Sequence, residues 1–237
     1  MKPIAGALTL ALAASASGTA VAQDWSGEGE LGFVATDSET TSSDTLTLKA
    51  RVGRETERWR HTAKAEALYA ESENEEGISS KTADRFFASW KTDRKLGEKH
   101  YIYGLINYET DGVLDLDYRV NESVGYGIRL LRGPKHILDT EIGVGARQTK
   151  INDVREDEGV LRLAADYRYN ISDAAHISEE ISVEHGSEST ITRSITGLSA
   201  KIQDNLASKI SYSYQHVDTD GDTTNESILA VTLVYSF

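Results

Sequence analysis

The chain has 237 residues, with 25 basic against 38 acidic side chains and a formal net charge of −13 at pH 7. A length of this order fits one large β domain or two small ones. The absence of cysteine excludes disulfides, zinc-thiolate sites and thiol catalysis. The excess of acid argues against nucleic acid as a partner, because phosphate binding requires clustered lysine and arginine. The 11 tyrosines and 39% hydrophobic residues argue against disorder.

The first 22 residues have the features of a cleaved export signal. Lys2 supplies a positive end, a short apolar stretch follows, and Ala20-Val21-Ala22 offers a small-residue cleavage site. We therefore expect a signal peptide over residues 1–22 and a mature domain over residues 23–237. A retained membrane anchor is the alternative, although the apolar run is short for a membrane span.

Beyond residue 22 the hydrophobic pattern has a period of two almost throughout, which predicts about twelve β-strands. In the clearest segment Val120, Val124 and Tyr126 share one parity, whereas Arg119 and Arg129 share the other. Segments near 81–92 and 99–108 are apolar on both parities, so the pattern does not say which face of these strands is which. Alternation alone fits a soluble β-sandwich as well as a membrane barrel whose apolar face meets lipid.

Three further features favour the barrel over the sandwich. The predicted connections alternate between short turns and longer segments, as in outer-membrane barrels. The longer segments hold 19 of the 38 acidic residues and only two basic ones, Lys150 and Arg155. Trp25, Trp59 and Trp90 fall near the short-turn rim and several tyrosines near the other rim, like two aromatic girdles. The longer segments lie near 37–44, 72–80, 109–117, 148–158, 186–190 and 217–226.

We therefore expect an all-β chain that forms a single antiparallel transmembrane β-barrel of about twelve strands, with short periplasmic turns and longer acidic outer loops. Its polar parity would line the lumen, where long side chains of both signs can pair and fill a narrow tube. The lumen-lining residues predicted in this way are Arg51, Arg60, Glu66, Arg119, Arg129, Glu141, Arg162, Asp166 and Arg168.

Several segments also share the pattern of a known family. They are Trp25-Ser-Gly-Glu-Gly-Glu-Leu-Gly-Phe33, Trp59-Arg-His61 with Glu66-Ala-Leu-Tyr-Ala70, Thr82-Ala-Asp-Arg-Phe-Phe-Ala-Ser89 and Thr192-Arg-Ser194. In this order they resemble the salt-induced outer membrane protein family, whose molecular function is unknown, over about residues 24–237. The first long loop departs from it, because Asp37-Ser-Glu-Thr-Thr-Ser-Ser43 stands where the family often has a Gly-Asn turn. The resemblance implies an outer-membrane barrel of a Gram-negative bacterium and supplies no catalytic residues.

The end of the chain and the acidic loops predict the partners. Leu233, Tyr235 and Phe237 resemble the terminal signal by which such barrels are recognised by the barrel assembly machinery. The acidic loops would meet lipopolysaccharide through bridging divalent cations, and the apolar face would meet outer-membrane lipid. The pattern calls for no cofactor and leaves the oligomeric state open.

One pair of residues has the spacing of a nucleophile and its base. His185 and Ser187 share a parity, and Glu184 precedes them, so a carboxylate, an imidazole and a hydroxyl lie close in sequence. The pair is similar to the His-x-Ser of outer-membrane lipid A deacylases. Against this hypothesis, Ser187 lies in a glycine-containing turn, which favours a solvated loop histidine.

Acidic residues near 218–226 have part of the pattern of a calcium loop. Asp218, Asp220 and Asp222 are spaced two apart, and such carboxylates can converge on one hard cation. The glycine comes two positions early and no glutamate stands at the twelfth position, so the EF-hand pattern is not met. A hydrated acidic hairpin is the alternative.

Three functions fit these features. The first is a non-enzymatic barrel of the cell envelope, linked to salt or osmotic stress. The second is a narrow diffusion channel, whose ion preference would be set by the charged lumen. The third is a lipid A-modifying enzyme built around His185 and Ser187.

Overall fold

The computed structural model describes residues 25–37, 41–74, 76–219 and 221–237. The expected signal peptide, residues 1–22, lies outside the described residues. No helix within the described ranges is long and apolar enough to cross a membrane.

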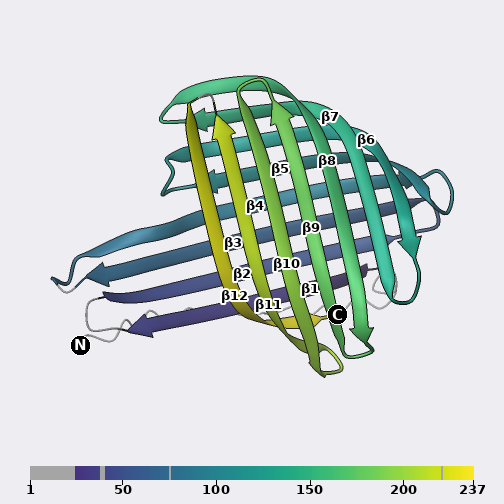
Figure 1. Ribbon diagram of the computed structural model, residues 1–237, viewed down its shortest axis with the longest axis horizontal. Helices are drawn as coiled ribbons and strands as arrows, with labels where there is room; N and C mark the ends of the chain where they lie inside the picture. Colours follow the sequence, from purple (N-terminus) through teal and green to yellow (C-terminus); the bar gives the residue numbers. More distant parts are fainter. Residues whose placement is uncertain (1–24, 38–40, 75, 220) are drawn as a thin grey trace.

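Twelve antiparallel strands close into a barrel, in which each strand pairs with its neighbours in the chain and β1 pairs with β12. The strands are β1 (Trp25–Asp37), β2 (Thr41–Glu55), β3 (Trp59–Asn74), β4 (Ser79–Lys95), β5 (His100–Asp111), β6 (Leu116–Arg132), β7 (His136–Ile151), β8 (Val154–Ser172), β9 (Ala175–Gly186), β10 (Ser189–Gln203), β11 (Leu206–Thr219) and β12 (Asp222–Ser236). Figure 1 shows β1 to β5 crossing behind β8 to β12 at a steep angle, because the strands of a barrel are tilted. The predicted antiparallel barrel is confirmed.

A short ladder between the first and last strands closes the barrel. Residues 28–31 pair with residues 233–236, and two backbone hydrogen bonds of 3.0 Å join Gly27 and Phe237. A Cβ atom at Gly27 would lie 2.3 Å from Phe237 Cζ, so the terminal ring occupies the space that a side chain would need. A side chain at this position would therefore require the exposed Phe237 ring to move.

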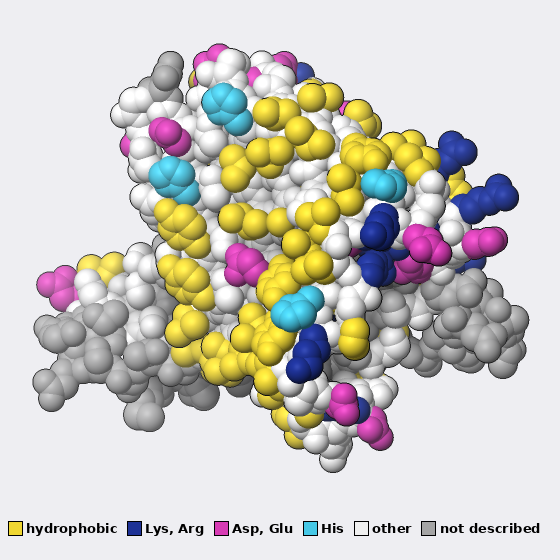
Figure 2. Space-filling view, turned by 45° about the vertical axis from the view of Figure 1, so that its right-hand side comes forward, with side chains coloured by type: hydrophobic (Ala, Val, Ile, Leu, Met, Phe, Trp, Pro, Cys, Tyr) yellow, Lys and Arg dark blue, Asp and Glu magenta, His cyan; other side chains and the backbone are white. Residues whose placement is uncertain are grey.

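Strand alternation separates an apolar outer face from a polar lumen. On β6, Arg119, Asn121 and Ser123 are buried in the lumen, whereas Val124 and Tyr126 are exposed on the outside. Figure 2 shows hydrophobic side chains spread over this outer face, with charged side chains mainly toward its ends. An exposed apolar surface that continues around a closed sheet fits lipid rather than water as its surroundings.

The register also shows which residues point into the lumen on the two strands that are apolar on both parities. On β4, Phe86 and Trp90 face outward, and Phe87 lines the lumen. On β5, Ile102 is exposed outside, whereas Tyr103 is buried inside. These two strands therefore place aromatic side chains on both of their faces.

The acidic segments are paired strand ends rather than open loops, which corrects the expected loop lengths. Only residues 152–153 connect β7 to β8, and the short-turn connection 133–135 has a similar length. The ladder continues past the apolar band because polar residues pair as strands just as well outside lipid. At this tip, a hydrogen bond of 2.6 Å from Lys150 Nζ lowers the pKa of the Asp153 carboxyl.

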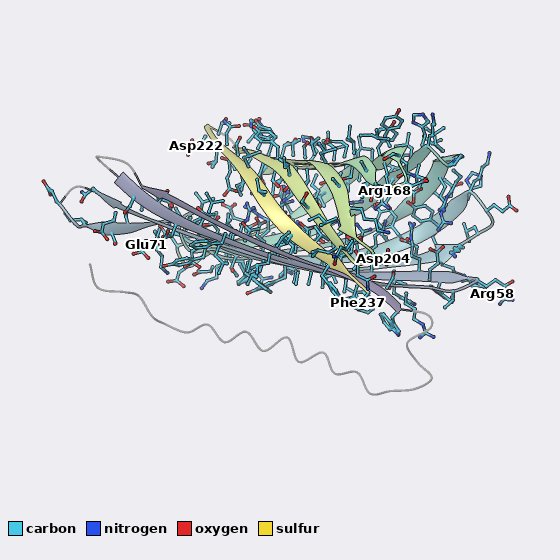
Figure 3. All side chains as sticks on the ribbon, turned by 90° about the horizontal axis from the view of Figure 1, so that it is seen from below. Arg58, Glu71, Arg168, Asp204, Asp222 and Phe237 are labelled. Carbon is cyan, nitrogen blue, oxygen red and sulfur yellow. The ribbon has the colours of Figure 1, made fainter. Side chains whose placement is uncertain are left out.

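The two rims nevertheless differ in charge. Figure 3 shows Glu71 and Asp222 at one end of the barrel and Arg58 and Phe237 toward the other end. The acidic end is formed by the connections predicted to be long, whereas the short turns at the other end carry basic and acidic side chains in similar numbers. We use the names acidic rim and turn rim for these two ends.

Candidate functional site: the charged lumen

The barrel encloses a cavity of about 260 Å³ that is lined by charged side chains of both signs. Six of the nine predicted lumen-lining residues contribute to its wall. The charged residues that line it are Arg51, Arg60, Lys64, Glu66, Arg85, Lys91, Asp93, Glu109, Asp139, Glu141, Arg162, Asp166, Glu180, Glu184, Arg193 and Glu226.

Two groups of opposite charge face each other across this cavity. Asp139, Asp166 and Glu180 are direct partners on β7, β8 and β9, so they form an acidic row. Arg51 and Lys64 are direct partners on β2 and β3. Arg51 Nη1 lies 3.4 Å from Glu180 Oε1, and Lys64 forms an ion pair with the same carboxylate. Because β3 and β9 are opposite strands in the closed order, these ion pairs cross the barrel.

A second set of contacts crosses the lumen around Tyr101, which is fully buried. Its hydroxyl donates a 2.8 Å hydrogen bond to Glu141 Oε1, and Lys91 forms an ion pair with the same carboxylate. The Arg60 guanidinium lies 5.2 Å from the centroid of the Tyr101 ring, within cation–π range. Arg60 Nε also donates a 2.5 Å hydrogen bond to Asp93 Oδ2. Cations from β3 and β4 are therefore held against β5 and β7.

The most buried part of the lumen is an ionic core around two glutamates. Glu109 and Glu184 have side chains that are only 4% and 3% exposed. Glu109 Oε2 accepts hydrogen bonds from Arg119 Nη1 at 3.0 Å and from Arg193 Nη2 at 2.6 Å. Glu184 lies 3.5 Å from Arg193 Nη1 and 3.8 Å from Arg162 Nε. Since β5 and β10 are far apart in the barrel order, Arg193 ties opposite walls together.

Arg147 extends this core toward the acidic rim. Its side chain is fully buried, and its Nη2 atom lies 2.8 Å from Glu158 Oε1 and 2.5 Å from the backbone oxygen of Ser189. Its Nη1 atom lies 4.0 Å from Glu184 Oε2. Arg85 and Glu226 form a further ion pair between β4 and β12. Three acidic residues of the segments expected as outer loops, Glu109, Glu158 and Glu226, therefore point into the lumen.

The remaining predicted lumen residues lie at the edges of this network. Glu66 forms an ion pair of 3.3 Å with Lys49. Arg129 is buried near the turn rim, 3.7 Å from Glu55 and over the Tyr101 ring. Arg168 has lumen parity on β8 but is exposed, at the end that carries the short turns.

Sequence reasoning missed several lumen residues on β4 and β5. Lys91, Asp93, Tyr101 and Tyr103 all point inward, although these strands are apolar on both parities. The sequence did contain an indication of the lumen face, because Lys91 and Asp93 share a parity with the inward-facing Phe87. Aromatic residues on both parities of these strands obscured this indication.

The proposed nucleophile and base lie at the tip of the β9–β10 hairpin. His185 is exposed on the outer face, where its Nδ1 atom lies 2.8 Å from Thr190 Oγ1. Ser187 stands in the connection 187–188, and Glu184 points into the lumen. The structure therefore pairs His185 with a hydroxyl of the neighbouring strand, and strand alternation separates it from the Glu184 carboxylate.

The acidic hairpin between β11 and β12 also separates its carboxylates. Asp218 is the direct partner of Thr223, and Asp222 is the direct partner of Thr219, so Asp218 and Asp222 face opposite sides of the hairpin. Asp220 lies outside the described residues. Nowhere in the described part of the chain do three histidine, aspartate or glutamate side chains gather as a metal site.

The C-terminal residues expected to act as an assembly signal lie on the outer face. Leu233, Tyr235 and Phe237 are 53%, 52% and 64% exposed. They alternate with Val234, which is buried in the lumen. This places an apolar, aromatic edge beside the seam that closes the barrel.

Comparisons with known proteins agree with this architecture. The chain is 27% identical over 188 residues to the uncharacterized protein YdiY of Escherichia coli strain K12, which covers 78% of this chain and 72% of that protein. In three dimensions it is similar to the COG4313 outer membrane channel from Pseudomonas putida F1, with a TM-score of 0.55, 11% identity and coverage of 90% of this chain and 95% of that chain. This structural likeness extends to the fold alone.

A family model matches residues 29–237, which include all but a few residues of the barrel. The resemblance read from the sequence pointed to a family without a known molecular function, and the matched family is likewise described only as one of unknown function. The chain belongs to the family described as Protein of unknown function, DUF481.

Proposed function

We propose that this chain is a non-enzymatic β-barrel of the outer membrane of a Gram-negative bacterium, with a lumen blocked by ion pairs. The observation that carries the proposal is the set of ion pairs that join opposite walls, such as Arg51 and Lys64 with Glu180 and Arg193 with Glu109. The apolar outer face supports a membrane location.

A solute that crossed the lumen would have to separate these ion pairs. Removing one partner of a buried, hydrogen-bonded pair leaves the other charge uncompensated, which is strongly unfavourable. Glu109, Glu184 and Arg147 have almost no contact with solvent, so water does not replace their partners. This favours a plugged barrel over an open pore.

Single-channel conductance in a planar bilayer tests the proposal. We expect the folded wild-type protein to show no discrete conductance steps. Replacing Glu180 by serine should produce them, because Glu180 receives both Arg51 and Lys64. The open path should prefer anions, since two cations then stand in the lumen without their carboxylate.

The control is Glu156→Ser, which removes an exposed carboxylate at the start of β8 and should leave the bilayer silent. Discrete steps from the wild-type protein would reject the plugged barrel. A silent Glu180→Ser variant, shown to be folded, would mean that the ion pairs with Glu180 do not block the path.

A narrow diffusion channel is the second candidate, and the cavity favours it. About 260 Å³ of space lies beside the ionic core. A smaller cavity of about 60 Å³ is also lined by Arg51, Lys64, Glu66 and Glu180, so the two cavities are adjacent. Opposed acidic and basic walls could guide small ions through such a path. The same conductance measurement decides between the two candidates.

We further propose a role in the cell envelope under salt or osmotic stress. The acidic rim supports it, because divalent cations could join carboxylates such as Glu71 and Asp222 to anionic lipopolysaccharide. We expect the amount of this protein to rise after cells are moved to high salt, measured by quantitative mass spectrometry of outer membranes. An unchanged amount would remove the link with salt.

The C-terminal edge supports the last part of the proposal, which concerns assembly. Leu233, Tyr235 and Phe237 are presented together on the outer face of β12. We propose that the barrel assembly machinery recognises this edge before β12 pairs with β1.

A further inference from the structure

One strand of the barrel has an outer face unlike the others. Outward positions of β12 carry Leu229, Val231 and Leu233, all more than half exposed. The outward positions of β10 instead carry hydroxyls over most of the strand. We use the name β9–β10 polar strip for Glu179 of β9 together with Thr190, Thr192, Ser194 and Thr196 of β10.

The outward direction of the strip follows from the register. Glu179 is the direct partner of Thr196 and, on its other side, of Tyr167. Its neighbours Ser178 and Glu180 have the lumen parity, and Glu180 lines the cavity. Glu179 stands four residues from the start of β9, which is about 13 Å along the strand. It is thus well inside the apolar band rather than at a rim.

The strip carries a carboxylate and the hydroxyls that contact it. Ser194 Oγ donates a 2.7 Å hydrogen bond to Glu179 Oε1, and Thr196 Oγ1 donates one to Glu179 Oε2. Exposed apolar side chains border the strip, including Ile181 at 41% and Tyr212 at 47% exposure.

Contact between such a polar strip and the hydrocarbon of a membrane is energetically unfavourable. An ionisable side chain within the membrane is costly, and it usually faces protein or water instead of lipid. Serine and threonine hydroxyls are common where membrane proteins contact one another, because they form hydrogen bonds across the contact. A second protein surface would shield Glu179 from hydrocarbon and bring further hydrogen-bond donors to its remaining lone pairs.

We propose that the β9–β10 polar strip is the surface through which two copies of this barrel associate side by side in the membrane. The inference rests on the membrane location proposed above. Copies inserted in the same direction are related by a two-fold axis along the membrane normal. Glu179 and Thr196 lie on adjacent strands at similar depth, so this rotation places Glu179 of each copy opposite the hydroxyls of the other. The Ser194 and Thr196 hydroxyls, which donate to Glu179 within one copy, can then turn and donate to Glu179 of the other copy.

Disulfide cross-linking in lipid vesicles tests this surface, because the chain contains no cysteine. The variant Thr192→Cys places one thiol in the strip, and Val124→Cys places one on the outer face of β6, where Val124 is 63% exposed. We expect covalent dimers from Thr192→Cys and only the random collision yield from Val124→Cys. Equal yields from the two variants would reject the surface.

A second substitution tests the part played by the carboxylate. In the Thr192→Cys background, Glu179→Leu should lower the association constant roughly tenfold, since hydrogen bonds are lost on both sides of the two-fold axis. The matched control is Glu122→Leu, which removes another outward-facing carboxylate, from β6. It should leave the association constant unchanged. An unchanged constant for Glu179→Leu would overturn the role given to the strip.

The mass of the wild-type protein gives a measurement without substitutions. Sedimentation equilibrium in detergent should give a dimer that dissociates on dilution, and a monomer at every concentration would reject the inference. Vesicle flotation separates this failure from that of the proposed function. A protein that floats with vesicles but stays monomeric overturns the dimer alone, whereas one that does not float overturns the membrane location.

Discussion

Replacing Glu184 by alanine is expected to lower the free energy of unfolding by about 3–5 kcal/mol, the typical cost of removing one partner from a buried ionic network. Glu184 is 3% exposed and lies within 4.0 Å of Arg147, Arg162 and Arg193. It also accepts a 3.0 Å hydrogen bond from Asn121 Nδ2. Without the carboxylate, three guanidinium groups would repel one another in a space that water barely reaches.

Urea titration in phospholipid vesicles measures this free energy, with the fluorescence of the outward-facing tryptophans as the signal. Glu184→Gln separates charge from packing, because the amide keeps the shape and an acceptor for Asn121. We expect Glu184→Gln to lower the free energy of unfolding nearly as much as Glu184→Ala does. The control Glu156→Ala, on an exposed residue, should stay within about 0.5 kcal/mol of the wild type. If Glu184→Ala were as stable as this control, the lumen charges would have to be well hydrated.

Strand count, closure and the facing of every strand except β4 and β5 were predictable, because a barrel imposes one simple rule on its sequence. Every strand that faces lipid on one side and a charged lumen on the other must alternate, as Val124 and Tyr126 do with Ser123 on β6. A slip of one residue would move lumen charges such as Arg119 into lipid, so the register is fixed by the pattern itself. The signal is local, and it can be read directly from the sequence.

The ion-pair partners within the lumen could not be predicted. Parity shows which face of a strand a residue lies on, but not its height along the barrel axis. Arg193 and Glu109 are separated by 84 residues, and they meet only because the tilt and stagger of six strands bring them to one height. Parity also failed on β5, where Tyr101 and Ile102 are both apolar in character but face opposite ways. These choices are set by the tertiary packing of the lumen.

The role of the lumen glycines was only half visible in the sequence. Gly125, Gly127 and Gly143 have the lumen parity on β6 and β7, but the sequence does not show which side chains lie over them. The structure shows that Tyr101 lies across Gly127, and that Tyr103 lies across Gly125 and Gly143. Two bulky rings thus fit inside the barrel because the neighbouring strands β6 and β7 have no side chains there.

Replacing Gly127 by alanine is therefore expected to destabilise the barrel by about 1–3 kcal/mol, the usual cost of overpacking a tight interior. The new Cβ would lie 2.1 Å from Tyr101 Cζ and 2.6 Å from its hydroxyl oxygen. Tyr101 is fully buried and donates a hydrogen bond to Glu141, so its ring cannot move without breaking that contact. The same urea titration measures the loss.

A double-variant cycle tests whether Tyr101 is the cause. In a Tyr101→Ala background the clash is absent, so Gly127→Ala should then cost almost nothing, and the difference between the two backgrounds measures the contact. The control Gly104→Ala, where no atom lies within 4 Å of the new Cβ, should be neutral or slightly stabilising. An equal cost of Gly127→Ala in both backgrounds would show that the strand itself, and not the tyrosine, requires glycine. The expected dependence on Tyr101 follows from the close fit between its ring and Gly127, where the strand carries no side chain.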